Sequence, residues 1–135
     1  MHFLLVNVSI VCYHLHMNPT TNKQIERKEL ARLIRYIVDN IKVATGCQIQ
    51  GVLCMDTHSN FANVRSLAIA SAYEFDHINP ATKYRTKSGN LVHLADMVKG
   101  ARYSLATILA EIAKCRVACT TCHRLYTHQE QRINV

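Results

Sequence analysis

Five residues in two short segments combine the side-chain types needed for hydrolysis assisted by a metal ion. Asp76 and His77 are adjacent, and Cys119, Cys122 and His123 follow later in the chain. Phosphodiester hydrolysis requires a cation that offsets charge on the phosphate and a base that takes a proton from water. A carboxylate can bind the cation, and an imidazole, which titrates at about pH 6.5, can take the proton from water. The alternative for an isolated Asp-His pair is a turn or an ordinary ion pair.

The Cys119-x-x-Cys122 spacing is one half of a tetrahedral zinc site, because two thiolates at this spacing lie close enough to share an ion. The other half must come from elsewhere in the chain. Cys47 and Cys54, with six residues between them, are the upstream candidates, and His58 is a substitute four residues beyond Cys54. The alternative is that Cys119 and Cys122 are core thiols.

Positive charge is concentrated in the C-terminal half of the chain. The 135 residues carry 16 Lys and Arg against 9 Asp and Glu, a formal net charge of +7. Residues 81–135 hold nine of these cations and three of these acids, whereas residues 1–80 hold seven and six. This distribution favours a polyanionic partner, because neutralising phosphates releases counterions and supplies most sequence-independent affinity for nucleic acid. A solvated basic surface is the alternative.

The segment 81–103 is polar and basic, and we expect it to be a long functional loop that contacts nucleic acid. Lys and Arg side chains bind the phosphate backbone and orient it without reading its sequence. The residues assigned to this role are Lys83, Arg85, Lys87, Lys99, Arg102 and, beyond the loop, Arg124. A soluble loop without a partner is the alternative.

Six cysteines could form three disulfides in a secreted protein. The first residues are apolar, but they lack a basic start and a small-residue cleavage site, and their apolar run is too short to span a bilayer. We therefore expect a cytoplasmic protein with reduced thiols and no membrane partner. Residues 1–20 are expected to be an extension outside the fold or an edge strand, and Met17 is an alternative start.

Apolar residues at helical spacing predict three helices. The first follows a capping-box pattern and covers residues 21–42, with Gly46 beyond its end. Its basic polar side is interpreted as a solvated face, with contact to DNA as the weaker alternative. The second begins after Ser104, a capping residue, and ends near Cys115, which is expected to be a buried core thiol. The third covers residues 123–131 and carries His123 near its start.

One strand is predicted over residues 67–75, where apolar side chains alternate, and it runs into Asp76 and His77. Neighbouring side chains of a strand point to opposite faces, so one of this pair can hold an ion while the other acts as a base only where the strand ends. Pro80 is consistent with such an ending. Farther along, Ser88-Gly89-Asn90 predicts a turn.

Two motif blocks resemble those of the small HNH endonucleases common in bacteriophages. They are Glu-Phe-Asp-His-Ile-Asn-Pro-Ala-Thr-Lys, beginning at residue 74, and Ile-Leu-Ala-Glu-Ile-Ala-Lys-Cys-Arg-Val-Ala-Cys-Thr-Thr-Cys-His-Arg, beginning at residue 108. The resemblance covers residues 30–130 approximately. It implies a ββα-metal finger, in which two strands and a helix surround one catalytic divalent ion, usually with a zinc staple beside it.

By motif position, the resemblance implies that Asp76 and His123 bind a catalytic Mg²⁺ or Mn²⁺ and that His77 is the general base. It further implies that Cys119 and Cys122 bind a structural Zn²⁺. Cys47 and Cys54 are the candidates for the other two ligands of that ion.

The chain departs from the family pattern at two positions. Gln50 stands where the family has the second cysteine of its first knuckle, so either Cys54 restores the zinc site or zinc is lost. Thr121 stands where the family commonly has an asparagine that orients the base or the substrate, which puts the catalytic rate in question.

The sequence therefore predicts an α+β fold, a small ββα-metal finger with an N-terminal helix and a zinc-knuckle staple, and residues 21–135 form the expected HNH nuclease domain. The expected function is metal-dependent hydrolysis of DNA phosphodiester bonds in the cytoplasm of a host cell, with other phage proteins as further partners. One alternative is a zinc-stapled DNA-binding module with weakened catalysis. Another is an accessory protein in phage assembly or packaging.

Overall fold

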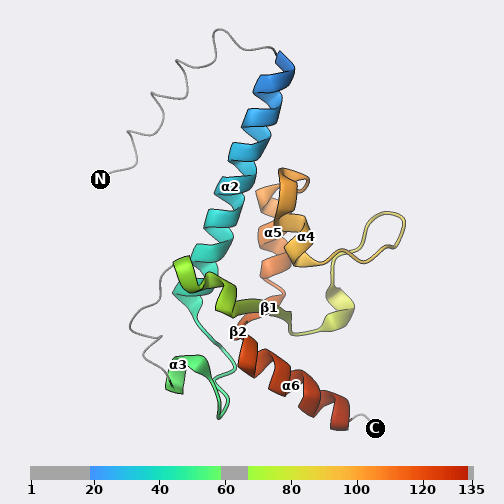
Figure 1. The fold of residues 1–135 in the computed structure, drawn as a ribbon. Helices are drawn as coiled ribbons and strands as arrows, with labels where there is room; N and C mark the ends of the chain where they lie inside the picture. Colours follow the sequence, from blue (N-terminus) through green and yellow to red (C-terminus); the bar gives the residue numbers. More distant parts are fainter. Residues whose placement is uncertain (1–18, 59–66, 134–135) are drawn as a thin grey trace.

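The computed structural model describes residues 19–58 and 67–133 (Figure 1). The predicted edge strand and the alternative start at Met17 lie outside the described residues. Within them the fold is α+β, with five α-helices, short 3₁₀ helices labelled η, and one two-stranded antiparallel sheet. The elements are α2 (Pro19–Thr45), α3 (Met55–His58), η2 (Leu67–Ala72), β1 (Tyr73–His77), η3 (Pro80–Thr82), α4 (Leu94–Val98), η4 (Lys99–Ala101), α5 (Leu105–Ile112), β2 (Cys115–Cys119) and α6 (Thr120–Ile133).

α2 is the longest element and includes the helix predicted over residues 21–42. It ends at Thr45, and Gly46 follows with a φ of 68°, a left-handed conformation that glycine adopts without strain. One apolar cluster joins α2 to α4 and α5; its buried members are Ile34, Val38, Leu94, Met97 and Ile108. The N-terminal turns of α2 extend past α4 and α5 in Figure 1. No described helix is both long and apolar enough to cross a membrane.

β1 and β2 pair in antiparallel register, which places Asp76 opposite Arg116. β2 leads directly into α6, and α6 contacts both strands. A second buried cluster lies at this end of the molecule and contains Cys47, Cys54, Tyr73, Val117, Cys119 and Cys122. Phe75 packs against both buried clusters. The strand that carries Asp76 and His77 is therefore fixed by two small cores.

Gln48 occupies the place of a third strand beside β2. Its main-chain N–H donates to the carbonyl of Val117 at 2.8 Å. Its side-chain Oε1 accepts from the N–H of Val117 at 2.7 Å. One residue of the loop after α2 thus satisfies both outward-facing backbone groups of Val117.

The strand predicted over residues 67–75 is wrong in its first part. Leu67–Ala72 form η2, and β1 begins only at Tyr73. Tyr73 pairs with Cys119, the last residue of β2, after which the chain turns into α6. Residues before Tyr73 therefore have no partner on β2, and alternation in a sequence does not reveal where a partner ends.

The predicted loop over residues 81–103 is wrong in that much of it is folded. An isolated β-bridge closes the predicted turn, where Gly89 has a φ of 84°. Leu94–Val98 form α4, with Leu94 and Met97 buried. This apolar signal is shorter than two helical turns, too short for periodicity to distinguish it from a loop.

α5 and α6 agree with the predicted second and third helices, whereas α3 was not predicted. Ser104 caps α5, its Oγ accepting from the N–H of Thr107 at 3.1 Å, and α6 carries His123 in its first turns. Cys115 was expected as a buried thiol at a helix end. It is instead the partly buried first residue of β2. The periodicity did not indicate β2; only the resemblance to a ββα unit implied a second strand.

Candidate functional site

β1 presents the candidate residues on two faces. Side chains alternate along a strand, so Glu74 and Asp76 share one face and His77 lies on the other. The first face meets α6, where His123 contacts both acids. The second face meets α5, where Glu111 contacts His77. β1 ends at His77, so Asp76 and His77 can have different partners and different roles.

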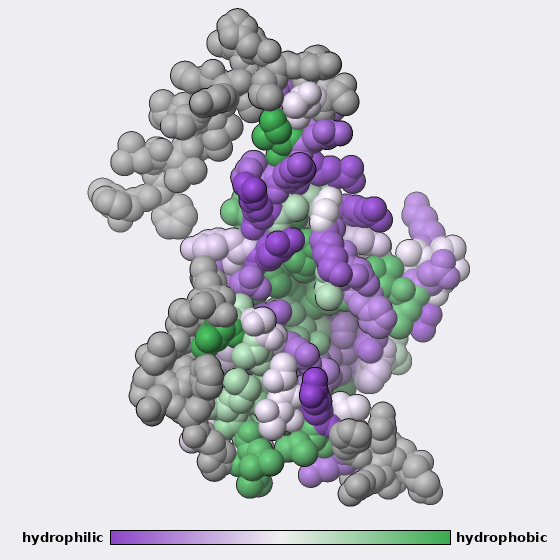
Figure 2. Space-filling model, in the orientation of Figure 1, coloured by the Kyte–Doolittle hydropathy of each residue, from purple (hydrophilic) through white to green (hydrophobic). Residues whose placement is uncertain are grey.

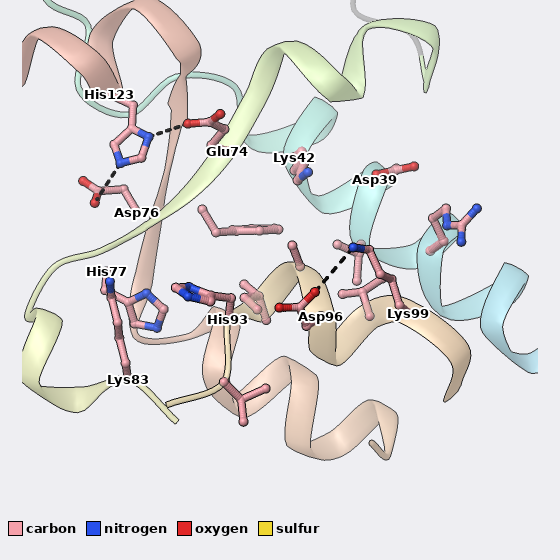
Figure 3. A pocket seen from close by; sticks show the side chains of 17 residues that line it. Asp39, Lys42, Glu74, Asp76, His77, Lys83, His93, Asp96, Lys99 and His123 are labelled. Carbon is pink, nitrogen blue, oxygen red and sulfur yellow. Dashed lines mark hydrogen bonds and ion pairs between the residues drawn. The ribbon is translucent and has the colours of Figure 1, made fainter. Parts of the chain in front are cut away.

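Asp76 and His123 converge at the boundary between β1 and α6. Asp76 Oδ1 lies 3.4 Å from His123 Nε2. The other oxygen, Oδ2, accepts from Arg116 Nε at 2.9 Å and from Arg116 Nη2 at 2.7 Å. Glu74 binds the remaining ring nitrogen of His123, Nδ1. Figure 3 shows Glu74 and Asp76 reaching the His123 ring from the same strand.

These partners determine which atoms remain to bind a cation. An ionised Glu74 can only accept, so it selects the tautomer of His123 with a proton on Nδ1, and in that tautomer of the neutral ring Nε2 carries a lone pair. This lone pair faces Asp76 Oδ1, which is also an acceptor. Two acceptors aimed at each other require a proton or a cation between them. Ligands about 2.1 Å from one ion lie roughly 3–4 Å apart, so the Asp76–His123 pair has a suitable separation.

Glu111 holds His77 on the opposite face of β1. Its side chain is buried, and Oε1 lies 2.7 Å from His77 Nε2 and accepts from the N–H of Tyr84 at 2.8 Å. Oε2 accepts from Lys114 Nζ at 2.6 Å. Burial opposes ionisation of Glu111, but the hydrogen bonds from Lys114, His77 and Tyr84 outweigh it and hold the pKa of Glu111 below its ordinary value. The carboxylate accepts Nε2–H, which leaves Nδ1 of His77 able to take a proton.

The two faces of β1 border one cleft of about 750 Å³. Glu74, Asp76, His77 and His123 all line it (Figure 3). The His77 side chain is 8% exposed, so its ring is held by protein on most sides while it still reaches solvent. A pair that could hold an ion and a histidine with a free ring nitrogen therefore share one accessible space, an arrangement suited to hydrolysis of a bound ester.

Only some of the predicted phosphate-contacting residues lie at the cleft. Lys83 and Lys99 line it. Arg85 instead donates to the carbonyl of Gly89 in its own turn at 2.9 Å. The other three are exposed and do not line the cleft: Lys87, Arg102 and Arg124. Two cations of α2 also line it: Arg35, which belongs to the side interpreted as solvated, and Lys42.

Four buried cysteines form a second candidate site, called the cysteine cluster. Its members are Cys47, Cys54, Cys119 and Cys122, and their Sγ atoms all lie within 4.8 Å of one another. Four sulfurs about 2.3 Å from one zinc ion would lie about 3.8 Å apart, so the cluster could hold a metal ion such as zinc. Cys54 completes the set in place of the cysteine that Gln50 replaces. The side chain of His58, the substitute ligand, lies outside the described residues.

Local hydrogen bonds position the first pair of cysteines. The end of α2 at Gly46 delivers Cys47, and a turn in which Cys54 N–H donates to Gly51 O at 3.0 Å returns the chain toward it. Asp56 then fixes this loop, because its Oδ2 accepts from the N–H of Cys47 at 2.7 Å while its Oδ1 accepts from the hydroxyl of Tyr73. Asp56 thus ties the cysteine cluster to the first residue of β1.

The cluster thiols differ in acidity. Burial raises the pKa values of Cys54 and Cys122. At Cys47, burial is outweighed by hydrogen bonds from three backbone N–H groups, which hold its pKa below the ordinary value. A metal ion that binds all four thiolates would therefore release protons. Cys115 lies apart from the cluster, and burial together with nearby carboxylates raises its pKa to about 11.

The two sites differ in the number of ligands that converge. Within residues 19–58 and 67–133, the cysteine cluster is the one group of three or more potential ligands gathered closely enough to share an ion. At the Asp76–His123 pair two side chains converge, so an ion there would keep other positions for water or substrate. Mg²⁺ commonly binds proteins in this way.

Three residues of the site were missed by sequence reasoning. Glu74 could have been found, because it is two positions from Asp76 and therefore on the same strand face. Glu111 also left a signal, since it is an acid beside the apolar stripe of a predicted helix. Arg116 left none, because its place opposite Asp76 depends on the register of a strand that the pattern did not predict.

Comparison of the chain with protein-family models, with curated proteins and with solved structures found no match. A function must therefore be proposed from the chemistry of the cleft and the cysteine cluster together with the motif resemblance.

Proposed function

We propose that the protein is a metal-dependent endonuclease of the HNH type that hydrolyses phosphodiester bonds in DNA. The observation that carries the proposal is the approach of Asp76 Oδ1 to His123 Nε2, at 3.4 Å, on a cleft that His77 also lines. β1 supplies Asp76 and His77, and α6 supplies His123. The order β1, β2, α6 along the chain is the one expected of a ββα-metal finger.

In this proposal His77 activates the attacking water. Its Nδ1 accepts a proton as the water oxygen attacks phosphorus and the bond from phosphorus to the leaving oxygen breaks. The imidazolium that forms is stabilised by the Glu111 carboxylate at Nε2. Glu111 also fixes the orientation of the ring through a contact that the family pattern would place elsewhere. The presence of Thr121 in place of the usual asparagine therefore does not leave His77 without an orienting partner.

Asp76 and His123 would hold the catalytic Mg²⁺ or Mn²⁺. When bound, such an ion offsets negative charge on the phosphate and on the leaving oxygen. Glu74 and Arg116 hold the two ligands in place from outside, a role that partners of metal ligands commonly have.

The cysteine cluster would hold a structural Zn²⁺. Its first pair lies in the loop after α2, and its second pair lies where β2 passes into α6. One ion would therefore join two segments that are distant in the chain. His123 directly follows Cys122, so the same ion would fix the start of the helix that carries a ligand of the catalytic ion.

The proposal is tested by nicking of supercoiled plasmid DNA with Mg²⁺, Mn²⁺, Zn²⁺ or chelator. We expect wild-type protein to nick with Mg²⁺ or Mn²⁺, to stop with chelator and to recover when the ion is restored. His77→Ala should lose roughly 10²- to 10⁴-fold in rate, as expected for a general base. His93→Ala is the matched control, because His93 lines the same cleft and its side chain makes no capping hydrogen bond.

Three outcomes would favour other interpretations. Undiminished cleavage by folded His77→Ala would overturn the assigned mechanism. Salt-dependent DNA binding with no turnover under any divalent ion would identify a zinc-stapled DNA-binding module. A protein that neither binds nor cuts DNA would leave an accessory role in phage assembly, an interpretation that cleavage by the isolated chain would exclude.

A further inference from the structure

α2 carries a basic stripe that runs into the cleft. Its members are Lys28, Arg32, Arg35 and Lys42. Successive members are four, three and seven residues apart, so they lie on one side of the helix. Arg35 and Lys42 line the cleft together with Glu74, Asp76 and His77 of β1. Lys28 and Arg32 continue the same side toward the N-terminal end of α2.

The stripe retains most of its positive charge. Arg32 pairs with Glu29 at 2.7 Å, but both side chains are more than half exposed, and such surface pairs are weak. In the part of the chain that the structure describes, Lys28, Arg35 and Lys42 make no ion pair. Asp39 is the one acid on this side of the helix between Arg32 and Lys42. Hydrophilic side chains cover much of α2 on the face seen in Figure 2.

Lys42 lies beside β1, the strand that carries Asp76 and His77. Its Nζ lies 5.4 Å from the centre of the Phe75 ring, a cation–π contact with the residue between Glu74 and Asp76. The stripe therefore begins at the strand that carries the candidate active site. Lys83 and Lys99 also line the cleft, and Lys99 pairs with Asp96 at 3.4 Å.

The length of the stripe matches a nucleic-acid backbone. At 1.5 Å per residue, Lys28 and Lys42 are separated by about 21 Å along the helix axis. One strand of duplex DNA has a phosphate about every 3.4 Å along its axis, so this distance corresponds to roughly six phosphates. A single small anion would not need charges spread over such a length.

We propose that the α2 stripe binds the phosphate backbone of duplex DNA that flanks the bond in the cleft. The proposal deepens the nuclease function and rests on it, because the cleft defines where the flank begins. The partner is duplex DNA, with its regularly spaced phosphates, and α2 supplies affinity and orientation without reading bases. The basic side of α2, which was interpreted from the sequence as solvated, thus becomes one wall of the binding surface.

The test measures binding in a His77→Ala background, so that cleavage does not interfere. Fluorescence anisotropy with a 24-base-pair duplex is recorded across a salt series. We expect Lys28→Ala and Arg35→Ala each to weaken binding by roughly twofold to fivefold, as for exposed ion pairs, and each to make the slope of log K against log salt shallower by about 0.9. Alanine favours helix, so both variants should keep the wild-type melting temperature.

Lys23→Ala is the matched control. Lys23 is an exposed cation on the same helix, but it lies about 100° or more around the axis from every member of the stripe. Its removal takes away the same charge and should leave the salt slope unchanged. Equal effects of Lys23→Ala and Arg35→Ala would overturn the stripe, because they would show a response to net charge alone.

A second arm locates the stripe relative to the cut. A duplex shortened on one side of the cleavage point should bind wild-type protein more weakly, and a Lys28→Ala/Arg35→Ala protein should be less sensitive to this shortening. Equal sensitivity of the two proteins would overturn the proposal. So would unchanged affinity of the stripe variants for DNA that the wild type cuts, and that result would leave the nuclease function intact. Failure of the wild type to bind or cut any DNA would instead reject both.

Discussion

The cysteine cluster and the Asp76–His123 pair share α6 but are organised in opposite ways. Cys122 and His123 are consecutive residues of α6. In the cluster four donors face one another and are buried. In the pair two donors converge, and their side chains are 18% and 30% exposed. The first arrangement leaves no coordination position for a substrate, and the second leaves several.

This difference shows how one helix can carry a residue of a candidate structural site next to a residue of a candidate catalytic site. Consecutive helical residues project about 100° apart, so Cys122 and His123 face different surroundings although they share a backbone. An ion in the cluster would join two distant segments, the first of which Asp56 also holds in place. In the pair, Glu74 contacts His123 and Arg116 contacts Asp76, so a protein partner orients each side chain. We therefore expect that each site can be removed without removing the other.

The sharpest way to break this comparison is Cys54→Ser, which should give the largest effect. The variant should lose bound zinc and most of its folding stability, because the binding free energy of a structural zinc ion, on the order of 10 kcal/mol, contributes directly to folding. Metal content by mass spectrometry and thermal unfolding by circular dichroism measure both. Cys115→Ser is the control and should keep the metal, because Cys115 lies outside the cluster. Full zinc content in folded Cys54→Ser would contradict the four-cysteine site.

Asp76→Asn tests the opposite half of the comparison. The variant should keep its zinc and its fold, because Asp76 lies outside the cysteine cluster. Its nicking rate should fall by roughly 10²- to 10³-fold, since loss of an ion that offsets phosphate charge removes several kcal/mol of transition-state stabilisation. Plasmid nicking and zinc content should be measured on the same preparation. Loss of zinc from this variant would show that the two sites are not separable.

Glu74→Gln should have a smaller effect and would sharpen the distinction between a ligand and its support. The neutral side chain should hold the His123 ring less firmly, which typically reduces metal affinity or activity 10- to 100-fold. The Mn²⁺ concentration that gives half-maximal nicking should rise accordingly, and saturating Mn²⁺ should restore much of the rate. If saturating Mn²⁺ restores nothing, Glu74 has a role other than support.

The smallest effect on stability in this series is expected from Glu111→Gln, and it should be seen in the pH dependence of unfolding. The pKa of Glu111 is lowered in the folded protein, so its ionisation stabilises the fold at pH values above the unfolded-state pKa of about 4.5. That contribution should disappear as the pH falls through the lower, folded-state pKa. The free energies of unfolding of wild type and Glu111→Gln in urea should therefore differ at pH 7 and converge as the pH falls through the folded-state pKa of Glu111. A difference that grows in acid would contradict the sign.

The longer helices and the candidate site residues could be predicted from the sequence because their signals are local. The apolar spacing of α2 and α5, the cap at Ser104 and the types of Asp76, His77 and His123 need no partner to be recognised. Cys54 was found as a candidate although its spacing from Cys47 is unusual. The candidate ligands were thus predicted more completely than the residues that hold them in place, such as Glu74 and Arg116.

The rest depended on pairing between distant segments. Where β1 begins is decided by the end of β2, and the place of Arg116 is decided by the same register. The basic side of α2 was interpreted as solvated because a helix does not reveal from its own sequence which cleft it will border. Arg35 and Lys42 acquire a functional interpretation only when β1 lies beside them.

Gln48 has a consequence for how this protein meets other chains. The outer edge of a two-stranded sheet is a template on which an extended peptide, or a second copy, can add a strand. Because Gln48 already satisfies the outward N–H and C=O of Val117, the middle of β2 offers no free backbone pair to a newcomer. The two-stranded sheet beside the candidate site thus has the middle of this edge protected against aggregation.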